Sequence, residues 1–396
     1  MAQLTVLKRK RNRKKMIGFL PREQKMDLPI LVITLILLVF GLVMLYSASY
    51  VVGIYRFHGD SLHYISDQLV FAAGGLLVLY IASRFDYRLL KNYSTSIFGL
   101  TIILLIVVFF MPEIKGVHRW IIIPNVMTFQ PSEIAKFSII LSFSKMIEAN
   151  YKKMKSLEYG IVPFMMLVVV YVGLLFLEPH LSCIMIIVAV AGILMFTGGS
   201  DIKYFVAALV AVVLAVAVII VMYPEFVVYA KSRIVAWLHP EEDLLGDGYQ
   251  TYQSLLAIGS GGLFGMGLGN GRQKHLHLPE PQNDFIFAVT CEELGFVGAS
   301  IIVVLFAVLV VRCLIIAMRK KDIFGKMLII GICSQIGVQT FLNMAVCTAT
   351  IPNTGISLPF FSEGGTSLLM LLAEIGVVLS VSRKKPDDEE AEESEI

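Results

Sequence analysis

Apolar residues fill long, nearly uninterrupted runs of this chain, without the short alternating patterns of soluble helices and strands. A helix needs about 20 apolar residues to cross about 30 Å of hydrocarbon, and ten runs approach that length. They are centred near Leu35, Leu76, Leu105, Ile140, Val168, Val188, Ala211, Val303, Ile330 and Leu371. The pattern predicts an all-α polytopic membrane protein, with ten transmembrane helices over residues 28–383.

The composition supports this class. Hydrophobic residues make up 57% of the 396 residues and charged residues 16%, whereas soluble domains carry about 25% charged residues. We expect no cleavable signal peptide, because the basic start leads directly into an apolar run of full spanning length. The cysteines lie in apolar runs without CxxC spacing, which predicts small core residues and neither disulfides nor metal ligands. They are Cys183, Cys291, Cys313, Cys333 and Cys347.

Lysines and arginines predict the orientation, because short cytoplasmic loops accumulate positive charge. Residues 1–27 form a basic arm, and 25 of the 33 lysines and arginines fall in that arm and in alternate short loops. Both termini are then cytoplasmic, and the long segment 225–284 between the seventh and eighth helices is extracellular. The arm is interpreted as an orientation signal that meets anionic lipid, not as a nucleic-acid site. The acidic tail 384–396 is expected to be disordered.

One stretch in which polar residues interrupt the apolar pattern runs from Leu278 to Gly298. A proline-bearing loop with Asp284 leads there into an apolar helix that carries Glu292 and Glu293. Carboxylates are costly in hydrocarbon, so both glutamates should face protein or a water-filled cavity. At 100° per residue, Glu292 lies about 80° and Glu293 about 180° around the helix from Asp284. We therefore expect the two glutamates to have different roles, with Glu292 nearer the site.

A second polar stretch covers residues 116–136. Pro131 suits the first position of a helix, and Glu133 suits the first turn, where the macrodipole favours an anion. Lys136 follows three residues later, within reach of an ion pair with Glu133. The pair is either a structural helix start or, together with Arg119, part of a cationic site for a lipid headgroup, since a lysine inside a span is functional by default.

Two further outer segments could line a site. The loop 350–367 is rich in Pro, Gly and Ser and is either a re-entrant turn or a wall of the site. The glycine-rich run 259–271 matches neither GxxxxGK[ST] nor a GxGxxG that opens a helix after a strand, so a nucleotide site is not indicated. It either packs closely against helices or approaches a bulky ligand, with Arg272 and Lys274 supplying positive charge beside it.

Taken together, these stretches resemble the SEDS family, the shape, elongation, division and sporulation proteins typified by RodA, FtsW and SpoVE. The resemblance covers about residues 27–383 and is closer to the FtsW/SpoVE branch than to RodA. The matching motifs are Gln130-Pro-Ser-Glu133, the block from Pro240 to Ser254, Gly261 to Gly267, Leu278-Pro-Glu-Pro, Asp284-Phe-Ile-Phe-Ala288, Glu292-Glu-Leu-Gly295, and Leu358-Pro-Phe with Gly364-Gly.

The resemblance implies a peptidoglycan glycosyltransferase in the bacterial cytoplasmic membrane. It would polymerise lipid II, the undecaprenyl-pyrophosphate-linked disaccharide peptide, on the outer face, with a class B penicillin-binding protein as partner. Asp284 would be the general base of a single inverting displacement that gives a β-1,4 linkage, although by position alone it is equally a helix N-cap. The substrate-binding candidates are Arg119, Glu133, Lys136, Gln253, Arg272, Lys274 and Glu292.

Three segments depart from the family pattern, at four positions. The family usually has Glu-Pro-Asp-Leu-Gly where this chain has Glu178-Pro-His180-Leu-Ser182, proline in place of Ser357, and tyrosine in place of Glu363. Roles at these positions therefore do not carry over from the resemblance.

The sequence leaves several alternatives open. A divalent ion, Mg²⁺ or Mn²⁺, could bridge the carboxylate and the pyrophosphate through oxygen ligands, since the histidines show no ligand spacing. A lipid II flippase is a rival function, because charges inside membranes also mark transport paths. The others are a non-catalytic scaffold for a cell-wall transpeptidase and a ligase that joins other lipid-linked glycans.

Overall fold

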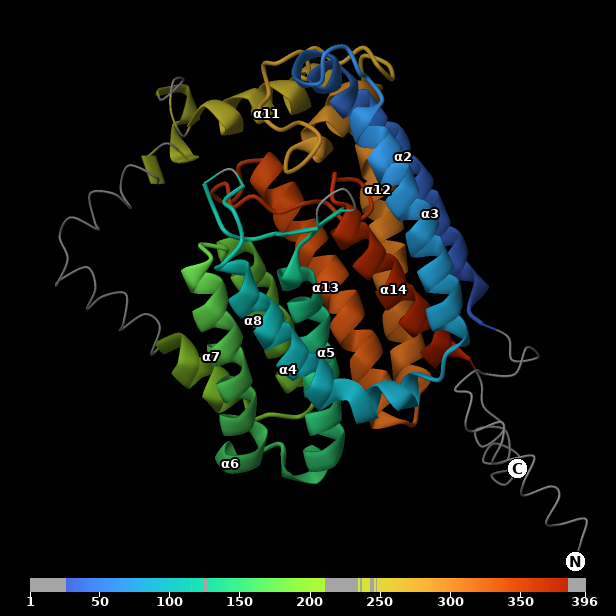
Figure 1. Cartoon of the computed structure of the whole chain (residues 1–396), viewed down its shortest axis with the longest axis vertical. Helices are drawn as coiled ribbons and strands as arrows, with labels where there is room; N and C mark the ends of the chain where they lie inside the picture. The colour runs from blue at the N-terminus through green and yellow to red at the C-terminus, as the bar shows by residue number, and fades with distance from the viewer. Residues whose placement is uncertain are drawn as a thin grey trace, which may run out of the picture.

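The computed structural model describes residues 26–114, 116–123, 127–210, 234–235, 237–242, 246 and 248–383. Within them the chain forms a helical bundle and one short antiparallel hairpin (Figure 1). The elements are α2 (Leu28–Arg56), α3 (His63–Arg84), η1 (Tyr87–Leu89), α4 (Leu90–Val108), β1 (Ile121–Ile123), β2 (Met127–Phe129), α5 (Pro131–Asn150), η2 (Tyr151–Lys153), α6 (Leu157–Gly160), α7 (Val162–Leu177), α8 (Leu181–Thr197), η3 (Pro240–Glu242), α11 (Gly248–Gly261), α12 (Ile286–Arg319), α13 (Ile323–Cys347) and α14 (Gly365–Ser382).

The polytopic helical class is confirmed. In the part of the chain that the structure describes, seven helical segments are long and apolar enough to cross a membrane, and α8 is a shorter apolar helix. The run near Ile140 is the 20-residue helix α5. The run near Ala211 lies mostly outside the described residues, as do most of the basic arm, the start of segment 225–284 and the tail 384–396. The count of ten spans therefore stays a prediction.

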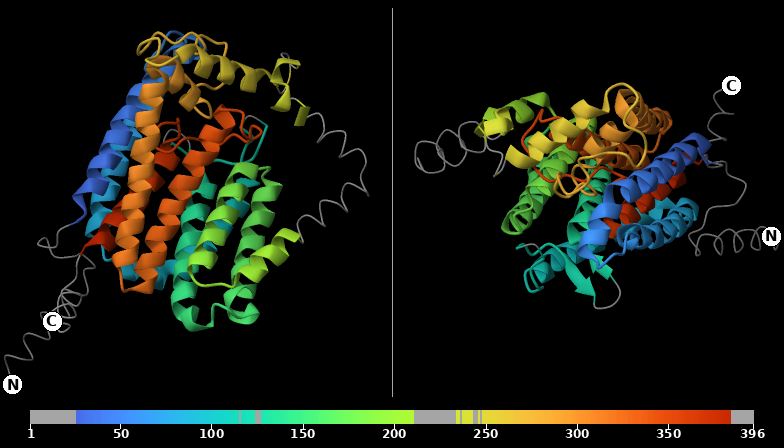
Figure 2. Two further views of the ribbon diagram at one scale, coloured as in Figure 1. Left: turned by 180° about the vertical axis from the view of Figure 1, so that it is seen from behind. Right: turned by 90° about the horizontal axis from the view of Figure 1, so that it is seen from above.

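The bundle has two halves joined by α13 (Figures 1 and 2). Helices α2, α3, α12 and α14 lie on one side, and α4, α5, α7 and α8 on the other, while α13 packs against α12 and also against α5 and α8. Helix α5 is the polar member of this arrangement, because Glu133, Lys136 and several serines are buried along it. Its neighbours enclose it, which keeps those groups away from lipid.

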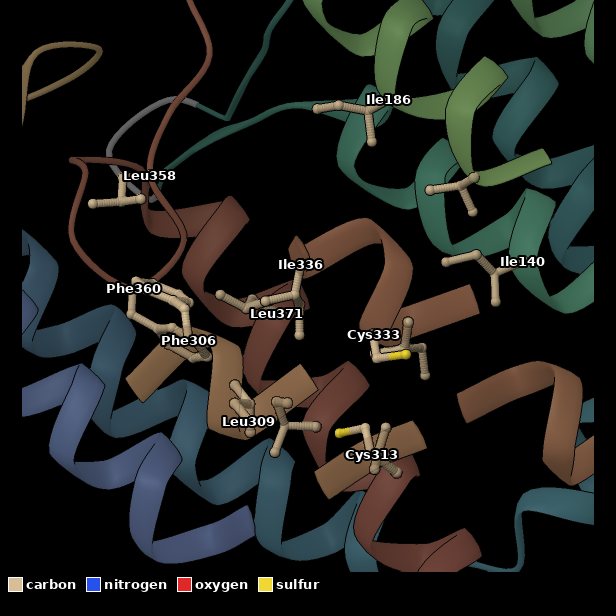
Figure 3. Packing of buried hydrophobic residues seen from close by; sticks show 14 of the residues in the cluster. Ile140, Ile186, Phe306, Leu309, Cys313, Cys333, Ile336, Leu358, Phe360 and Leu371 are labelled. Atoms are coloured by element: carbon tan, nitrogen blue, oxygen red, sulfur yellow. The ribbon is translucent and has the colours of Figure 1, made fainter. Parts of the chain in front are cut away.

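The apolar core runs through the whole bundle, and one part of it lies where α12, α13 and α14 meet (Figure 3). Phe306 and Leu309 of α12 pack there near Ile336 of α13 and Leu371 of α14, and Phe360 reaches in from the loop before α14. The rings of Phe306 and Phe360 lie 6.3 Å apart between centroids. All five cysteines are free and buried, as the sequence predicted.

The first and last described segments meet at one end of the bundle. The backbone N–H of Asp27 donates to Ser382 Oγ at 3.1 Å, and the Asp27 carboxylate accepts from Arg312 Nη2 at 2.7 Å. Helix α11 crosses the opposite end (Figures 1 and 2). Segments near the two termini therefore lie on one side, as the charge pattern predicted; the membrane orientation itself stays a prediction.

Helix α12 is not the continuous helix that the sequence predicted from near Asp284. It begins at Ile286 and is broken at Gly295, whose φ of 68° and ψ of −170° are non-helical. The glycine-rich run replaces the lost helical bonds: the amides of Met266 and Gly267 donate to the carbonyls of Glu292 and Glu293, both at 3.0 Å. A Cβ on Gly265 would lie 2.1 Å from Glu293 O. The packing interpretation of this run is thus confirmed.

Close packing of α14 on α3 gives a test of the fold. A Cβ on Gly376 would lie 2.6 Å from the carbonyl oxygen of Leu79, so Gly376→Ala should force the helices apart and cost about 1–3 kcal/mol. Gly74→Ala on α3, where a Cβ meets nothing within 4 Å, should be neutral or stabilising, because alanine favours helices. Thermal unfolding in detergent measures both, and equal melting temperatures would contradict the close contact.

Candidate functional site

A cavity of about 730 Å³ opens near the α11 end, between the two halves of the bundle. Its wall is built by the α2–α3 corner, the β-hairpin, the starts of α5 and α8, the loop before α12 and the loop between α13 and α14. Four candidates that are far apart in the sequence line it together: Arg119, Glu133, Lys136 and Asp284. In Figure 1 these segments all lie toward the α11 end of the bundle.

One side of the cavity carries cations. Lys136 is 3% exposed, and its Nζ lies 2.9 Å from Glu133 Oε2, which confirms the ion pair expected from the i, i+3 spacing. The same ammonium donates to Gln339 Oε1 of α13 at 3.3 Å. Gln339 in turn donates to Ser357 O at 3.0 Å. The lysine is thereby fixed between α5 and α13.

Arg119 lies in the loop before β1 and reaches across to the α7–α8 corner. Its Nε donates to Glu178 O at 3.2 Å, and its Nη2 donates to Pro179 O. Burial lowers the pKa of the guanidinium, and the nearby carboxyl groups of Glu178 and Asp284 act in the opposite direction. An arginine side chain is protonated at physiological pH even when its pKa is lowered. Arg119 therefore contributes a second positive charge to the wall.

Asp284 is held by its backbone. Asn343 Nδ2 on α13 donates to Asp284 O at 2.8 Å and to Ile356 O at 2.6 Å. Gly355 has φ +68°, and a Cβ there would lie 3.3 Å from Asp284 Oδ2, so a glycine lets this loop approach the carboxylate. The N-cap alternative is wrong, because α12 has Phe285 in the cap position. Asp284 instead lines the cavity.

The loop that carries Asp284 is tied down on two sides. Arg56 Nη1 at the end of α2 lies 3.3 Å from Glu280 Oε1. Asn283 Nδ2 donates to Glu280 Oε2 at 2.7 Å, and Ser362 Oγ donates to Asn283 O at 2.6 Å. These bonds fix the loop that carries Asp284 against α2 and against the loop before α14.

The other substrate-binding candidates do not line this cavity. Lys274 is fully buried, and its Nζ lies 2.6 Å from Glu293 Oε1 and 3.0 Å from Ser47 Oγ on α2. Glu292 Oε1 accepts from the backbone N–H of Arg272 at 2.7 Å. Both carboxylates thus anchor the glycine-rich loop to α12. The expectation that Glu292 and Glu293 have different roles is wrong, because the loop curls around the helix and meets both.

Arg272 and Gln253 are likewise elsewhere. The Arg272 side chain is exposed, and Gln253 is half-buried on α11, outside the set of lining residues. Lys274 is held in the buried ion pair with Glu293, and Glu292 binds the backbone N–H of Arg272. These contacts place Arg272, Lys274 and Glu292 outside the cavity, although the sequence predicted that they contact substrate.

Sequence reasoning missed Gln339 and Asn343, the α13 residues that hold Lys136 and Asp284. A signal for them existed: Gln335, Gln339 and Asn343 recur every four residues, which puts three amides on one face of an apolar helix. Polar groups on one face of a span face the protein interior.

All three departures from the family pattern reach the same cavity. His180, Ser182, Ser357 and Glu363 line it. The Ser182 hydroxyl donates to the carbonyls of Thr354 and Gly355, the latter at 3.2 Å. These positions therefore contribute to the wall near Asp284.

Among the described residues, no group of three or more His, Cys, Asp or Glu side chains is arranged to hold a metal ion. Magnesium at phosphate sites commonly takes one or two carboxylates plus substrate oxygens, and Asp284 could supply one carboxylate. The described segments themselves offer no metal cage.

Comparison with known proteins agrees with this geometry. A model of the FtsW, RodA and SpoVE family, described as "Cell cycle protein", matches residues 28–387. The probable peptidoglycan glycosyltransferase FtsW of Geobacter sulfurreducens is 38% identical over 365 residues, which cover 91% of this chain and 96% of that protein. Stage V sporulation protein E of Bacillus subtilis is 38% identical over 361 residues, which cover 90% and 97%.

Solved structures show the same fold. A chain from "Structural coordination of polymerization and crosslinking by a peptidoglycan synthase complex" has a TM-score of 0.76 at 25% identity, covering 90% of this chain and 97% of that one. The rod shape determining protein RodA of Thermus thermophilus has a TM-score of 0.67 at 25% identity, covering 91% and 98%.

The buried anchor predicts a strong effect on stability. Glu293→Gln leaves the Lys274 ammonium buried without its carboxylate, and removing one partner of such a pair costs about 3–5 kcal/mol. The double variant Lys274→Met with Glu293→Gln should recover part of the melting temperature. The exposed pair Lys203 and Asp201 serves as control: Asp201→Asn should not change the melting temperature. If the two side chains act independently, the double variant will show no recovery of the melting temperature.

Glu178 predicts a pH dependence. It is 1% exposed, and burial raises the pKa of its carboxyl to about 8, against the effect of Arg119. The folded chain then keeps a proton that the unfolded chain loses above about pH 4.5, so this group lowers stability as pH rises from about 4.5 to 8. Glu178→Gln should raise the melting temperature at pH 8.5 and leave it unchanged at pH 5.

The exposed Glu241→Gln is the control for that experiment and should leave both melting temperatures unchanged. A wild-type melting temperature with the same pH profile as Glu178→Gln would contradict a buried neutral carboxyl at this position.

Proposed function

We propose that this chain, which belongs to the FtsW/RodA/SpoVE family of cell cycle proteins, is a peptidoglycan glycosyltransferase that polymerises lipid II at the outer face of the bacterial cytoplasmic membrane. The observation that carries the proposal is the meeting of Asp284 with Arg119 and Lys136 in one cavity. A transfer of this kind needs a base for the acceptor hydroxyl and positive charge for the leaving pyrophosphate.

Asp284 is the proposed general base. The 4-hydroxyl oxygen of the acceptor N-acetylglucosamine attacks the anomeric carbon of the donor N-acetylmuramic acid, and the Asp284 carboxylate takes the hydroxyl proton. The bond from that carbon to the pyrophosphate oxygen breaks, and the pyrophosphate leaves with the electron pair. One displacement converts the α-linked donor into a β-1,4 linkage. The hydrogen bond from Asn343 Nδ2 to Asp284 O supports this role, because it fixes the backbone that carries the carboxylate.

Arg119 and Lys136 are proposed to bind the pyrophosphate. Negative charge grows on this group as the bond breaks, and fixed cations in a site with little water stabilise it strongly. Pyrophosphate is already a good leaving group, so no protein acid is needed. Glu133 is proposed to hold Lys136 in place through their 2.9 Å ion pair, which makes Glu133 a positioning residue.

The main rival is a lipid II flippase, which would need polar groups through the membrane's depth. Deeper in the bundle, the buried Glu374 carboxylate accepts from Gln335 Nε2 at 2.9 Å, and neither residue lines the cavity. The clustering of Asp284 and the cations at one end supports chemistry over transport.

A class B penicillin-binding protein is the proposed partner. The similarity to a chain of a peptidoglycan synthase complex, with a TM-score of 0.76, supports such an assembly. Partner dependence is therefore part of any assay of this protein.

The direct test is polymerisation of labelled lipid II by purified protein, with and without the candidate partner. Asp284→Asn should abolish glycan formation, a loss of at least about 100-fold for a general base, at equal amounts of folded protein. Asp60→Asn, which alters an exposed carboxylate on the α2–α3 turn, is the matched control and should retain wild-type activity.

Each rival predicts another result. A flippase moves labelled lipid II across vesicles without making glycan, in the wild type and with any partner. A scaffold supports transpeptidase recruitment even with Asp284→Asn. Full polymerase activity in Asp284→Asn would reject Asp284 as the base.

A further inference from the structure

The corner between α7 and α8 presents a polar side chain that the fold itself does not use. His180 is the N-cap residue of α8, yet its side chain makes no capping bond. The backbone holds it instead: His180 N donates to Leu175 O at 2.9 Å, and His180 O accepts from Ile184 N at 3.2 Å. The residue lines the cavity.

The ring nitrogen Nδ1 of His180 is buried, and no described group hydrogen-bonds to it. A buried polar atom left without a partner destabilises the protein, so such an atom in a cavity wall indicates a ligand that pairs with it. The neighbouring charges indicate the ligand's chemistry, because Arg119 and Lys136 line the same cavity.

Those cations also fix the state of the ring. Burial, with Arg119 and Lys136 beside it, lowers the pKa of His180 to about 3. The imidazole is therefore neutral at physiological pH and carries one N–H donor and one acceptor nitrogen. A neutral donor can bind an anion between two cations without adding a third charge.

Hydrogen bonds connect the wall that carries His180 to the loop beside Asp284. Ser182, two residues further on, donates to Thr354 O and Gly355 O, and Gly355 lies against the Asp284 carboxylate. A ligand group bound at His180 is thus held in a fixed position relative to Asp284, the proposed base.

Substitution by a carboxylate would have the opposite effect. The related pattern has aspartate where this chain has His180, and an aspartate would place a negative charge beside Arg119. That charge would compete with an anionic ligand for the guanidinium, whereas the neutral ring leaves it available.

We propose that His180 is a diphosphate-binding residue, whose neutral imidazole donates a hydrogen bond to a diphosphate oxygen held by Arg119 and Lys136. The inference rests on the proposed function and names the group of the donor that this wall binds. The same chemistry is offered by a lipid diphosphate and by free inorganic pyrophosphate, and the experiment separates these sources.

The test measures binding without turnover. Farnesyl diphosphate and inorganic pyrophosphate are titrated against the purified full chain in detergent by calorimetry. A hydrogen bond to a charged group contributes about 1.5–3 kcal/mol, so His180→Ala should weaken binding about 10- to 100-fold. His180→Gln, which keeps a neutral N–H donor, should lie near the wild type, and His180→Asp should bind more weakly than His180→Ala. The exposed His239→Gln is the control and should match the wild type.

The outcomes are distinct. Weakening for both probes supports the hydrogen bond and assigns recognition to the diphosphate itself; weakening for farnesyl diphosphate alone supports it for the lipid-linked form. Wild-type affinity in both His180→Ala and His180→Asp, or no binding of either probe by the wild type, overturns the proposal. His180→Gln keeps the test decisive if the alanine variant does not fold.

Failure of the proposed function would look different. The wild type would then make no glycan from lipid II with any partner, while the effect of His180→Ala on diphosphate binding would persist. Because the two readouts are independent, each proposal can fail alone.

Discussion

The exclusion of charge from hydrocarbon is the constraint on which this structure depends. An ionised side chain in a spanning helix must face protein or water, and this chain meets the rule by pairing its buried charges with one another and with neighbouring polar groups. Lys136 binds Glu133 and Gln339, and Lys274 binds Glu293 and Ser47. The first network borders a cavity and the second is sealed. The same rule thus yields one site for ligand and one anchor for the fold.

The anchor explains how the cavity acquires its outer wall. Gly295 interrupts α12, and the backbone groups freed there are taken by the glycine-rich loop that follows α11. Glu292 and Glu293 hold the same loop through its amides. The segment from this loop to Asp284 is consequently fixed at both ends, by the anchor and by Asn343. A charged group far from the cavity therefore helps to position the proposed base.

Features that depend on residues close together in the sequence could be predicted from it. Features that depend on partners far apart in the sequence could not. The helical, membrane-spanning class follows from the apolar runs, and the Glu133–Lys136 pair from a spacing of three within one helix. Asp284 emerged through family resemblance, since its position alone allowed an N-cap. The placement of Lys274 and Glu292 outside the cavity was not predicted, because it depends on a contact with α2 and on a loop wrapped around α12, neither of which sequence spacing encodes. The role of Asn343 was hidden for the same reason.

The most direct test of the central claim maps where the substrate lies. A lipid II analogue with a photoreactive group near the pyrophosphate, bound to the wild type and irradiated, should label peptides from the cavity wall around Arg119, Lys136 and His180. Excess unlabelled lipid II should suppress that labelling. Labelling that unlabelled lipid II suppresses, but that is confined to the loop after α11 near Arg272 and Lys274, would contradict the account. It would place the substrate at the segment that the structure assigns to anchoring.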